Sequence, residues 1–180
     1  MTNSQESLDH PKKDDYRTIE QTMEKLSGGT RRLAAQLTTS ASFDSLWNVL
    51  TDYDRLNLYI PNLLSSKKIY QKNNNVHLKQ VGAQDFLGMK FSAEVTIDLL
   101  EEKELGLLTF SLIKGDFRKF EGSWKIQNIK DTTKNSLIYD LTVQGCQWMP
   151  IGMIEKRLKK DLSENLIAVD RQAKSSKRSL

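Results

Sequence analysis

Residue types that carry catalysis are scarce and scattered along this sequence of 180 residues. The two histidines are His10, in a polar N-terminal stretch, and His77, beside a predicted turn, and neither has a second histidine or cysteine at metal-ligand spacing. Cys146 is the single cysteine, and the sequence places no histidine beside it, so we do not expect a thiol nucleophile. The pair Gly28-Gly29 stands alone, whereas a phosphate-binding loop needs a longer glycine-rich motif. We therefore expect no catalytic set, no metal site and no bound cofactor.

The carboxylates give no sign of a paired general acid and base. Glu94 and Asp98 alternate with apolar residues, which places them on the wet face of a strand. Asp52 and Asp54 lie near two predicted short helices, where they fit the mouth of a cavity or, as we favour, a cap or surface position. No acidic residue has a visible reason for a perturbed pKa, so the sequence favours a binding protein over an enzyme.

Bulky apolar residues form a more informative set, because they alternate with polar residues in successive segments. Such alternation places them on one face of a sheet, and aromatic and methionine side chains commonly line sites for lipophilic molecules. The same pattern fits a solid core equally well. A glycine opposite them, Gly122, would leave space or allow a bend. The residues expected to face inward are Met89, Phe91, Phe110, Phe120, Trp124, Tyr139 and, on a helix, Met153.

The element that must cover this apolar set is a helix predicted from Pro150 to about Ala173. Its apolar residues recur at steps of three and four, which is the helical period, and charged residues fill the opposite face. Pro150 suits the first helical position, where its missing N–H leaves no donor unpaired. About 24 residues at 1.5 Å each make roughly 35 Å of helix, which is long enough to lie across a whole sheet.

The period changes to two in the middle of the chain, which predicts strands. The predicted elements, by residue number, are a strand over 31–39, short helices over 43–51 and 53–59, and strands over 67–71, 76–81, 89–99, 106–114, 117–129 and 137–143. Consecutive strands with one apolar face and one long amphipathic helix predict an α+β domain. Its expected form is a curved antiparallel sheet of about six or seven strands around the C-terminal helix.

The expected divisions of the chain are a flexible arm over residues 1–29, a domain over 30–174 and a basic tail over 175–180. In the arm, residues at helical spacing such as Ile19 and Met23 predict a short docked helix over 15–27 or, as we favour slightly, a nascent one. The arm lacks an apolar signal segment and no apolar run approaches ~18 residues, so neither secretion nor a membrane span is predicted. A single cysteine fits a reducing compartment, so we expect a cytoplasmic protein, or one peripheral to a membrane.

The net charge is mild, +4 from 27 basic and 23 acidic residues, and much of the excess falls in the predicted helix and tail. The simplest interpretation is a solvated helix face. The alternative is attraction to an anionic membrane or to RNA. Lys156, Lys159 and Lys160 are the candidates for contact with a membrane or a partner.

Three segments, in order, resemble the START-like (SRPBCC) family of polyketide cyclases/dehydrases and coenzyme-Q-binding proteins. They are Phe43-Asp44-x-Leu46-Trp47 with Tyr59-Ile60-Pro61-Asn62-Leu63, then Phe120-Glu121-Gly122-x-Trp124, and then Trp148-x-Pro150-x-Gly152-x-Ile154-Glu155-x-Arg157-Leu158. The likeness covers residues 31–173. It implies the helix-grip fold and a deep cavity between sheet and helix that holds a hydrophobic molecule.

The resemblance leaves three functions open. The leading one is non-catalytic binding or carrying of a hydrophobic small molecule, such as a lipid or a prenylquinone. The alternatives are a cyclase or dehydratase of an aromatic precursor, and a module that binds a ribosome or another partner; nucleic acid is expected only through a ribosome. In a carrier, Tyr139, Trp124 and Arg157 are candidates to orient a polar head group, Arg157 most weakly because it can pair with Asp161.

Overall fold

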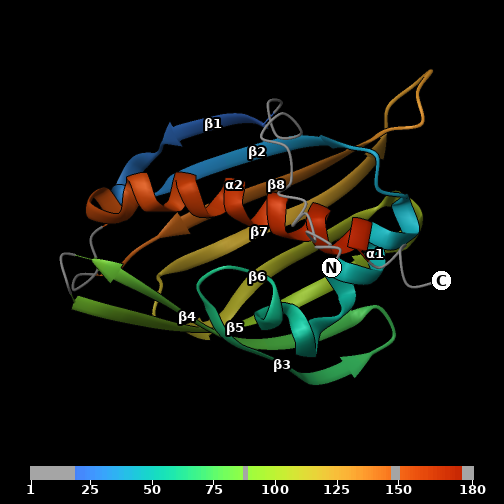
Figure 1. The fold of residues 1–180 in the computed structure, drawn as a ribbon. Coiled ribbons are helices and arrows are strands. Elements are labelled where there is room, and N and C mark those ends of the chain that lie inside the picture. Colours follow the sequence, from blue (N-terminus) through green and yellow to red (C-terminus); the bar gives the residue numbers. More distant parts are fainter. Residues whose placement is uncertain (1–18, 87–88, 147–150, 176–180) are drawn as a thin grey trace, which may run out of the picture.

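An eight-stranded antiparallel sheet curves around one long helix (Figure 1). The computed structural model describes residues 19–86, 89–146 and 151–175, without the side chains of residues 84–86, 89–91 and 151–154. In chain order the elements are β1 (Ile19–Lys25), η1 (Ser27–Gly29), β2 (Arg31–Thr39), α1 (Phe43–Thr51), η2 (Tyr53–Leu58), β3 (Leu63–Lys72), β4 (Asn75–Phe86), β5 (Met89–Glu102), η3 (Lys103–Leu105), β6 (Leu107–Gly115), β7 (Lys119–Asn128), β8 (Asn135–Gln144) and α2 (Ile151–Ser175). The strand order is β1-β2-β8-β7-β6-β5-β4-β3, so β1 and β3 are the two edges.

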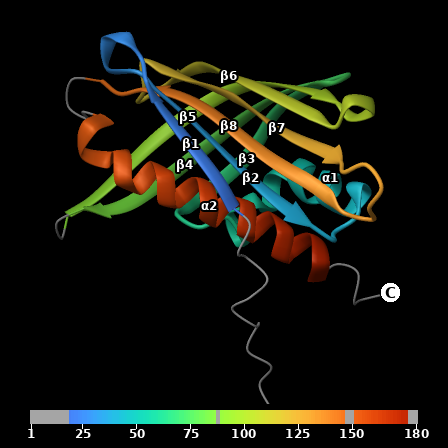
Figure 2. The same cartoon turned by 90° about the horizontal axis from the view of Figure 1, so that it is seen from above.

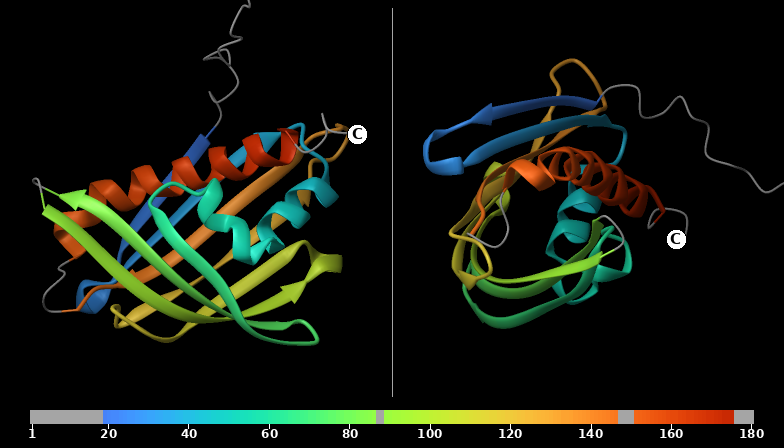
Figure 3. Two further views of the ribbon diagram at one scale, coloured as in Figure 1. Left: turned by 60° about the horizontal axis from the view of Figure 1, so that its bottom comes forward. Right: turned by 90° about the vertical axis from the view of Figure 1, so that its left-hand side faces the viewer.

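The long helix α2 lies across the concave side of this sheet. Viewed from one end, the strands wrap around the interior while α2 covers the open side (Figure 3). α2 packs mainly on β2, and its C-terminal part lies beside α1 (Figure 2). The predicted α+β helix-grip architecture is thereby confirmed, with one strand more than the upper estimate. Pro150, which we expected to begin the helix, lies outside the described residues.

The buried face of α2 follows the apolar spacing of its sequence. Leu162 and Leu166 are buried against the sheet, and so is one carboxylate, that of Asp170, which is 1% exposed. Asp170 accepts a hydrogen bond from the Thr39 hydroxyl and forms an ion pair with Lys174, with 2.9 Å between Nζ and Oδ2. A buried carboxylate is tolerated only when it is paired in this way. These contacts fix the C-terminal half of the helix to the end of β2.

The prediction for the start of the chain is wrong where the structure describes it. Instead of a helix within residues 15–27, Ile19–Lys25 forms strand β1, which pairs antiparallel with β2 along its whole length. The spacing of the apolar residues was ambiguous, because residues four apart lie on one side of a helix and equally on one side of a strand. Ile19 and Met23 both pack on the core from β1. Pairing with β1 satisfies the outer backbone groups of β2, so these residues extend the sheet instead of belonging to a flexible arm.

Gly122 on β7 allows close packing in the centre of the sheet. It pairs with Phe110 of β6 and with Leu141 of β8. A Cβ atom at this position would overlap the carbonyl oxygen of Asp140 and would lie 2.9 Å from Cζ of Phe110. The Phe110 ring therefore occupies the space that a side chain at residue 122 would need.

Candidate ligand-binding cavity

A cavity of about 340 Å³ lies between the concave face of the sheet and α2. Its walls come from strands β3 to β8, from α1 and η2 at one end, and from one face of α2. Apolar side chains dominate these walls. Sites for small molecules are typically apolar hollows of roughly 300–1,000 Å³, so the cavity has the size and lining of such a site. Periodicity in the sequence did not distinguish a hollow from a solid core, and the structure shows the hollow.

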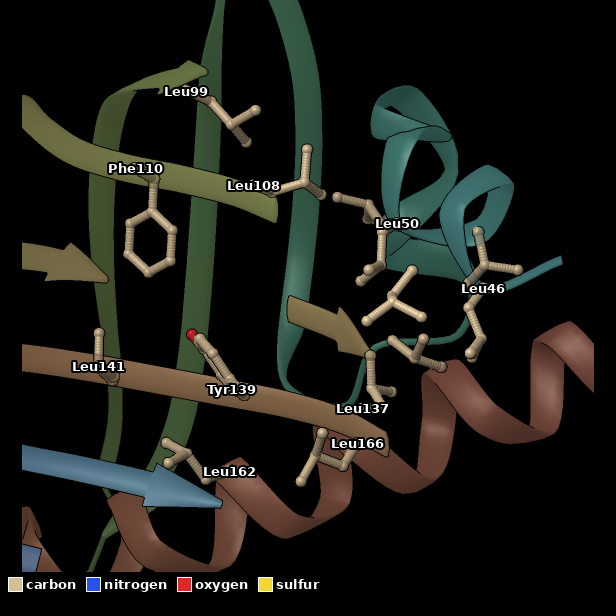
Figure 4. Close-up of a cluster of buried hydrophobic side chains, with 14 of the residues drawn as sticks. Leu46, Leu50, Leu99, Leu108, Phe110, Leu137, Tyr139, Leu141, Leu162 and Leu166 are labelled. Carbon is tan, nitrogen blue, oxygen red and sulfur yellow. The ribbon is translucent and has the colours of Figure 1, made fainter. Parts of the chain in front are cut away.

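Aromatic rings cover the strand side of the cavity. Trp124 of β7 and Tyr139 of β8 are cross-strand partners, and their rings stack with centroids 4.0 Å apart and planes at 10°. Phe110 of β6 lies 6.4 Å from Tyr139 and 5.6 Å from Phe120, measured between ring centroids. Figure 4 shows Phe110 and Tyr139 extending toward each other from β6 and β8. This wall offers flat apolar surface that suits an aliphatic or aromatic guest.

One face of α2 forms the opposite wall. Leu158 and Leu162 line the cavity from this helix, and so do two polar residues, Asp161 and Asn165. Neither polar residue is among the site residues predicted from the sequence. The signal was nevertheless present, because residues three and four apart lie on the same face of a helix. Counting from Leu158, the next positions on that face are 161, 162 and 165, so the apolar face carries polar groups at the cavity.

Asp161 is the single charged residue on the wall among the lining residues that the structure describes. Its Oδ1 atom accepts hydrogen bonds from Nδ2 of Asn62 at 3.2 Å and from Nε of Arg157 at 3.1 Å. The predicted pairing of Arg157 with Asp161 is thus present. Arg157 itself is not one of the described lining residues. A carboxylate therefore contributes to the wall while its basic partner does not.

The buried tyrosines are held in their neutral form. Burial, and then the negative charge of Asp161, raise the pKa of the Tyr139 phenol well above its ordinary value of 10.0. Burial, and then the hydrogen bond to Glu101, do the same for the pKa of Tyr53. Both hydroxyls consequently keep their protons across the physiological range and can act as hydrogen-bond donors.

Four of the residues predicted to form the site lie on the wall of the cavity: Phe110, Phe120, Trp124 and Tyr139. Met89 and Phe91 belong to β5 and Met153 belongs to α2, but their side chains lie outside the described residues. That these residues bind a ligand stays a prediction.

The three lysines proposed for surface contact lie on the outer side of α2. Lys156, Lys159 and Lys160 are exposed, and none of them lines the cavity. Lys160 pairs with Glu164, with 3.4 Å between Nζ and Oε1. Their contact with a membrane or a partner stays a prediction.

Groups suited to metal binding or nucleophilic catalysis are not gathered in the parts of the chain that the structure describes. No cluster of three or more histidine, cysteine, aspartate or glutamate side chains occurs there. The rings of His77 and Tyr70 are tilted by 33° with centroids 4.6 Å apart, Nε2 of His77 lies 3.5 Å from Oδ1 of Asp98, and His77 is not one of the described lining residues. In these same ranges, none of the helices combines the length and apolarity needed to cross a bilayer.

Comparisons with known proteins agree with this fold. A family model described as polyketide cyclase / dehydrase and lipid transport matches residues 39–170. A solved STAR-related lipid transfer protein from Xanthomonas axonopodis is similar with a TM-score of 0.72 at 13% identity, over 89% of this chain and 96% of that chain. The Zhui aromatase/cyclase from Streptomyces sp. R1128 is similar with a TM-score of 0.68 at 14% identity, over 81% of this chain and 94% of that chain. Human StAR-related lipid transfer protein 5 is similar with a TM-score of 0.70 at 6% identity, over 92% of this chain and 89% of that chain.

At these identities the structural likeness shows the fold alone. The neighbours include lipid transfer proteins and a cyclase, so they do not choose between carrying and catalysis. The matches also do not separate a coenzyme-Q-binding branch from the others. A sequence search of curated proteins finds no match.

Proposed function

Because the chain belongs to the family described as polyketide cyclase / dehydrase and lipid transport, we propose that it binds and carries a hydrophobic small molecule without transforming it. The observation that carries this proposal is the hollow of about 340 Å³ with its largely apolar wall. Two of the structural neighbours are named lipid transfer proteins, so the fold is compatible with this function. Burying roughly 200 Å² of apolar ligand surface contributes about 5 kcal/mol before the entropic cost of binding. Apolar contact is therefore the main favourable contribution that this wall offers to a lipophilic guest, and it grows with the apolar area that the guest buries.

Within this class, the ligand we propose is a lipid or a prenylated quinone. The stacked pair Trp124 and Tyr139 offers a flat surface on which a quinone-like ring can lie offset. Leucines on α2 and on the sheet offer aliphatic surface for a chain, Leu158 and Leu162 among them. A molecule with a ring and a prenyl chain would use both parts of the wall.

Organic extraction of protein purified from its native cells, followed by mass spectrometry, tests the carrier function. We expect a lipophilic molecule in the extract, and uptake of decylubiquinone by the emptied protein. Ala93→Phe adds a ring on the cavity wall and should lower that uptake at least fivefold. Ala34→Phe is the matched control, because Ala34 alternates with buried residues of β2 and faces the other side of the sheet. An empty extract together with no uptake by wild type would overturn the proposal.

A cyclase or dehydratase reaction is the second candidate, and the lining carboxylate of Asp161 is the observation that favours it. An inward-facing titratable group is what such an enzyme needs for general acid or base catalysis. The hydrogen bonds that Asp161 accepts from Asn62 and Arg157 fit a fixed structural group better than a base. Asp161→Asn separates the two functions: turnover of an aromatic precursor would be abolished in an enzyme, whereas a carrier would keep its uptake of decylubiquinone.

We also propose that the outer side of α2 contacts an anionic membrane through Lys156, Lys159 and Lys160. Each lysine near such a surface contributes about 1 kcal/mol. Replacing all three by glutamine should therefore lower binding to phosphatidylserine vesicles by more than tenfold and leave ligand uptake unchanged. Replacing Lys67 and Lys68, exposed on edge strand β3, is the control. Co-sedimentation with ribosomes in place of vesicles would favour the partner-binding alternative.

A further inference from the structure

Three tyrosines in the described part of the chain are buried or half-buried, and they differ in how their hydroxyls are satisfied. Oη of Tyr53 donates to Oε1 of Glu101 at 2.6 Å, and Oη of Tyr59 donates to the carbonyl oxygen of Val49 at 2.6 Å. Tyr139 is only 8% exposed, yet its hydroxyl forms no hydrogen bond with any residue that the structure describes. Its oxygen is not one of the fully buried polar atoms that lack a partner, so the hydroxyl opens onto the cavity, where a guest molecule can meet it.

Packing fixes the direction of this hydroxyl. The Tyr139 ring is stacked on Trp124, with centroids 4.0 Å apart, and the Phe110 ring lies 6.4 Å away. In Figure 4 the oxygen of Tyr139 points from β8 toward the Phe110 ring, and both residues line the cavity. A donor held rigidly in an apolar hollow forms stronger hydrogen bonds than the same group in water. The Tyr139 hydroxyl is therefore preorganised to meet a polar group on a guest molecule.

Charge on the wall narrows the kind of polar group that fits. Asp161 is the single charged residue among the described lining residues, and its partner Arg157 is not one of them. Arg157 balances part of the charge of Asp161, with 3.1 Å between Nε and Oδ1, but of this pair only the carboxylate lines the cavity. A guest carboxylate would therefore lie closer to Asp161 than to the guanidinium in a space of low polarity, which is unfavourable. Tyr139 keeps its proton there, because burial and the charge of Asp161 raise its pKa. The phenol thus acts as a donor toward a neutral oxygen.

We propose that the cavity selects an uncharged lipophile with one oxygen acceptor, a ketone, quinone carbonyl or alcohol, which accepts a hydrogen bond from Oη of Tyr139. The corresponding carboxylate is discriminated against because Asp161 lines the same space. This inference rests on the proposed carrier function and adds the chemistry of the head group. Tyr139 is then the residue that recognises the guest, and Asp161 is the residue that rejects anions.

Competition against the neutral dye Nile red tests this selectivity with decan-2-one and decanoate, two probes of equal chain length. Wild type should bind the ketone at least tenfold more tightly than the carboxylate at neutral pH. Tyr139→Phe should weaken binding of the ketone about fivefold to tenfold, since one buried hydrogen bond is lost. Asp161→Asn should raise the affinity for decanoate about tenfold and leave that for decan-2-one within twofold.

Tyr59→Phe is the matched control, because Tyr59 is not one of the described lining residues and its hydroxyl is already bonded to the carbonyl oxygen of Val49. We expect this variant to bind decan-2-one as wild type does. Equal affinity of wild type and Tyr139→Phe for the ketone would overturn the inference, as would a wild-type preference for decanoate. If wild type binds neither probe nor Nile red, the carrier function itself fails, so the two failures are distinguishable.

Discussion

A methyl group added at Gly122 should destabilise the fold far more than the same methyl group added at Gly82. Both glycines lie in strands beside the cavity, Gly122 in β7 and Gly82 in β4. A Cβ at Gly122 would overlap the carbonyl oxygen of Asp140 and would come within 2.9 Å of the Phe110 ring. A Cβ at Gly82 would meet only the carbonyl oxygen of Asn62, at 3.6 Å, which is an ordinary contact.

The size of the effect follows from what must move. Overpacking of a well-packed core costs about 1–3 kcal/mol, and we expect the upper end for Gly122→Ala because the overlapped atom is backbone in the neighbouring strand. Gly82→Ala should be neutral or stabilising by about 0.5 kcal/mol, since alanine restricts the unfolded chain more than glycine does. For a chain of 180 residues, a loss of about 3 kcal/mol lowers the melting temperature by about 6–12 °C.

Urea unfolding followed by tryptophan fluorescence measures both free energies on the same protein. We expect a lower midpoint for Gly122→Ala at an unchanged m-value, which reports a change of stability and not of the denatured state. Its uptake of decylubiquinone should fall as well, because the displaced Phe110 ring lines the cavity. Free energies of unfolding within about 0.5 kcal/mol of each other for the two variants would refute the assignment of a tight contact at Gly122.

Four further substitutions test side-chain contacts in the fold. Tyr53→Phe should lose about 1–2 kcal/mol of stability because it removes a bond to a carboxylate, whereas Tyr139→Phe should lose nothing in the ligand-free protein; thermal unfolding of both compares them. Asp170→Asn should lose about 1–2 kcal/mol in urea unfolding, since the amide still accepts a hydrogen bond but no longer carries the charge. The hydrogen bond from Arg31 lowers the pKa of Glu155 below its ordinary 4.5. Its stabilisation is therefore present above about that pH and is lost as the pH falls through the lowered pKa, so Glu155→Gln should weaken the acid dependence of stability between pH 5 and pH 3.

Much of the fold could be predicted from the sequence because long elements repeat their pattern many times. The alternation of Val95, Ile97 and Leu99 with polar residues recurs across β5, and all three are buried. In α2, Leu162 and Leu166 continue a stripe that only a helix can place on one face. Over such lengths the two periods cannot be confused.

The N-terminal strand could not be predicted because its pattern is short and ambiguous. Ile19 and Met23 are four residues apart, which fits either period, and two positions do not decide between them. These residues form a strand because the edge of β2, which comes later in the chain, offers hydrogen-bond partners to their backbone. Such a tertiary contact leaves no local signal in the sequence.

The candidate site was predictable on its strand side and not on its helix side. Phe110 and Tyr139 alternate with polar residues, so their inward direction follows from the pleat. On α2, the sequence predicted only that Asp161 can pair with Arg157, and it did not place Asp161 at the cavity. The pair does form, but α2 packs so closely on the sheet that Asp161 also lines the cavity. Residue type alone does not reveal how deeply a helix is seated.

The way α2 is attached has a consequence for exchange of the guest. In the described ranges, the hydrogen bonds that tie the helix to the remainder of the chain all involve a side chain, such as those from Gln21, Arg31, Thr39 and Asn62. The strands, in contrast, are joined to one another by continuous backbone ladders. Moving α2 away from the curved sheet would thus open the cavity without breaking any backbone hydrogen bond between strands. In the proposed carrier, exchange of the bound molecule would then require only side-chain hydrogen bonds and apolar contacts to break, while the backbone hydrogen bonds of the sheet stay intact.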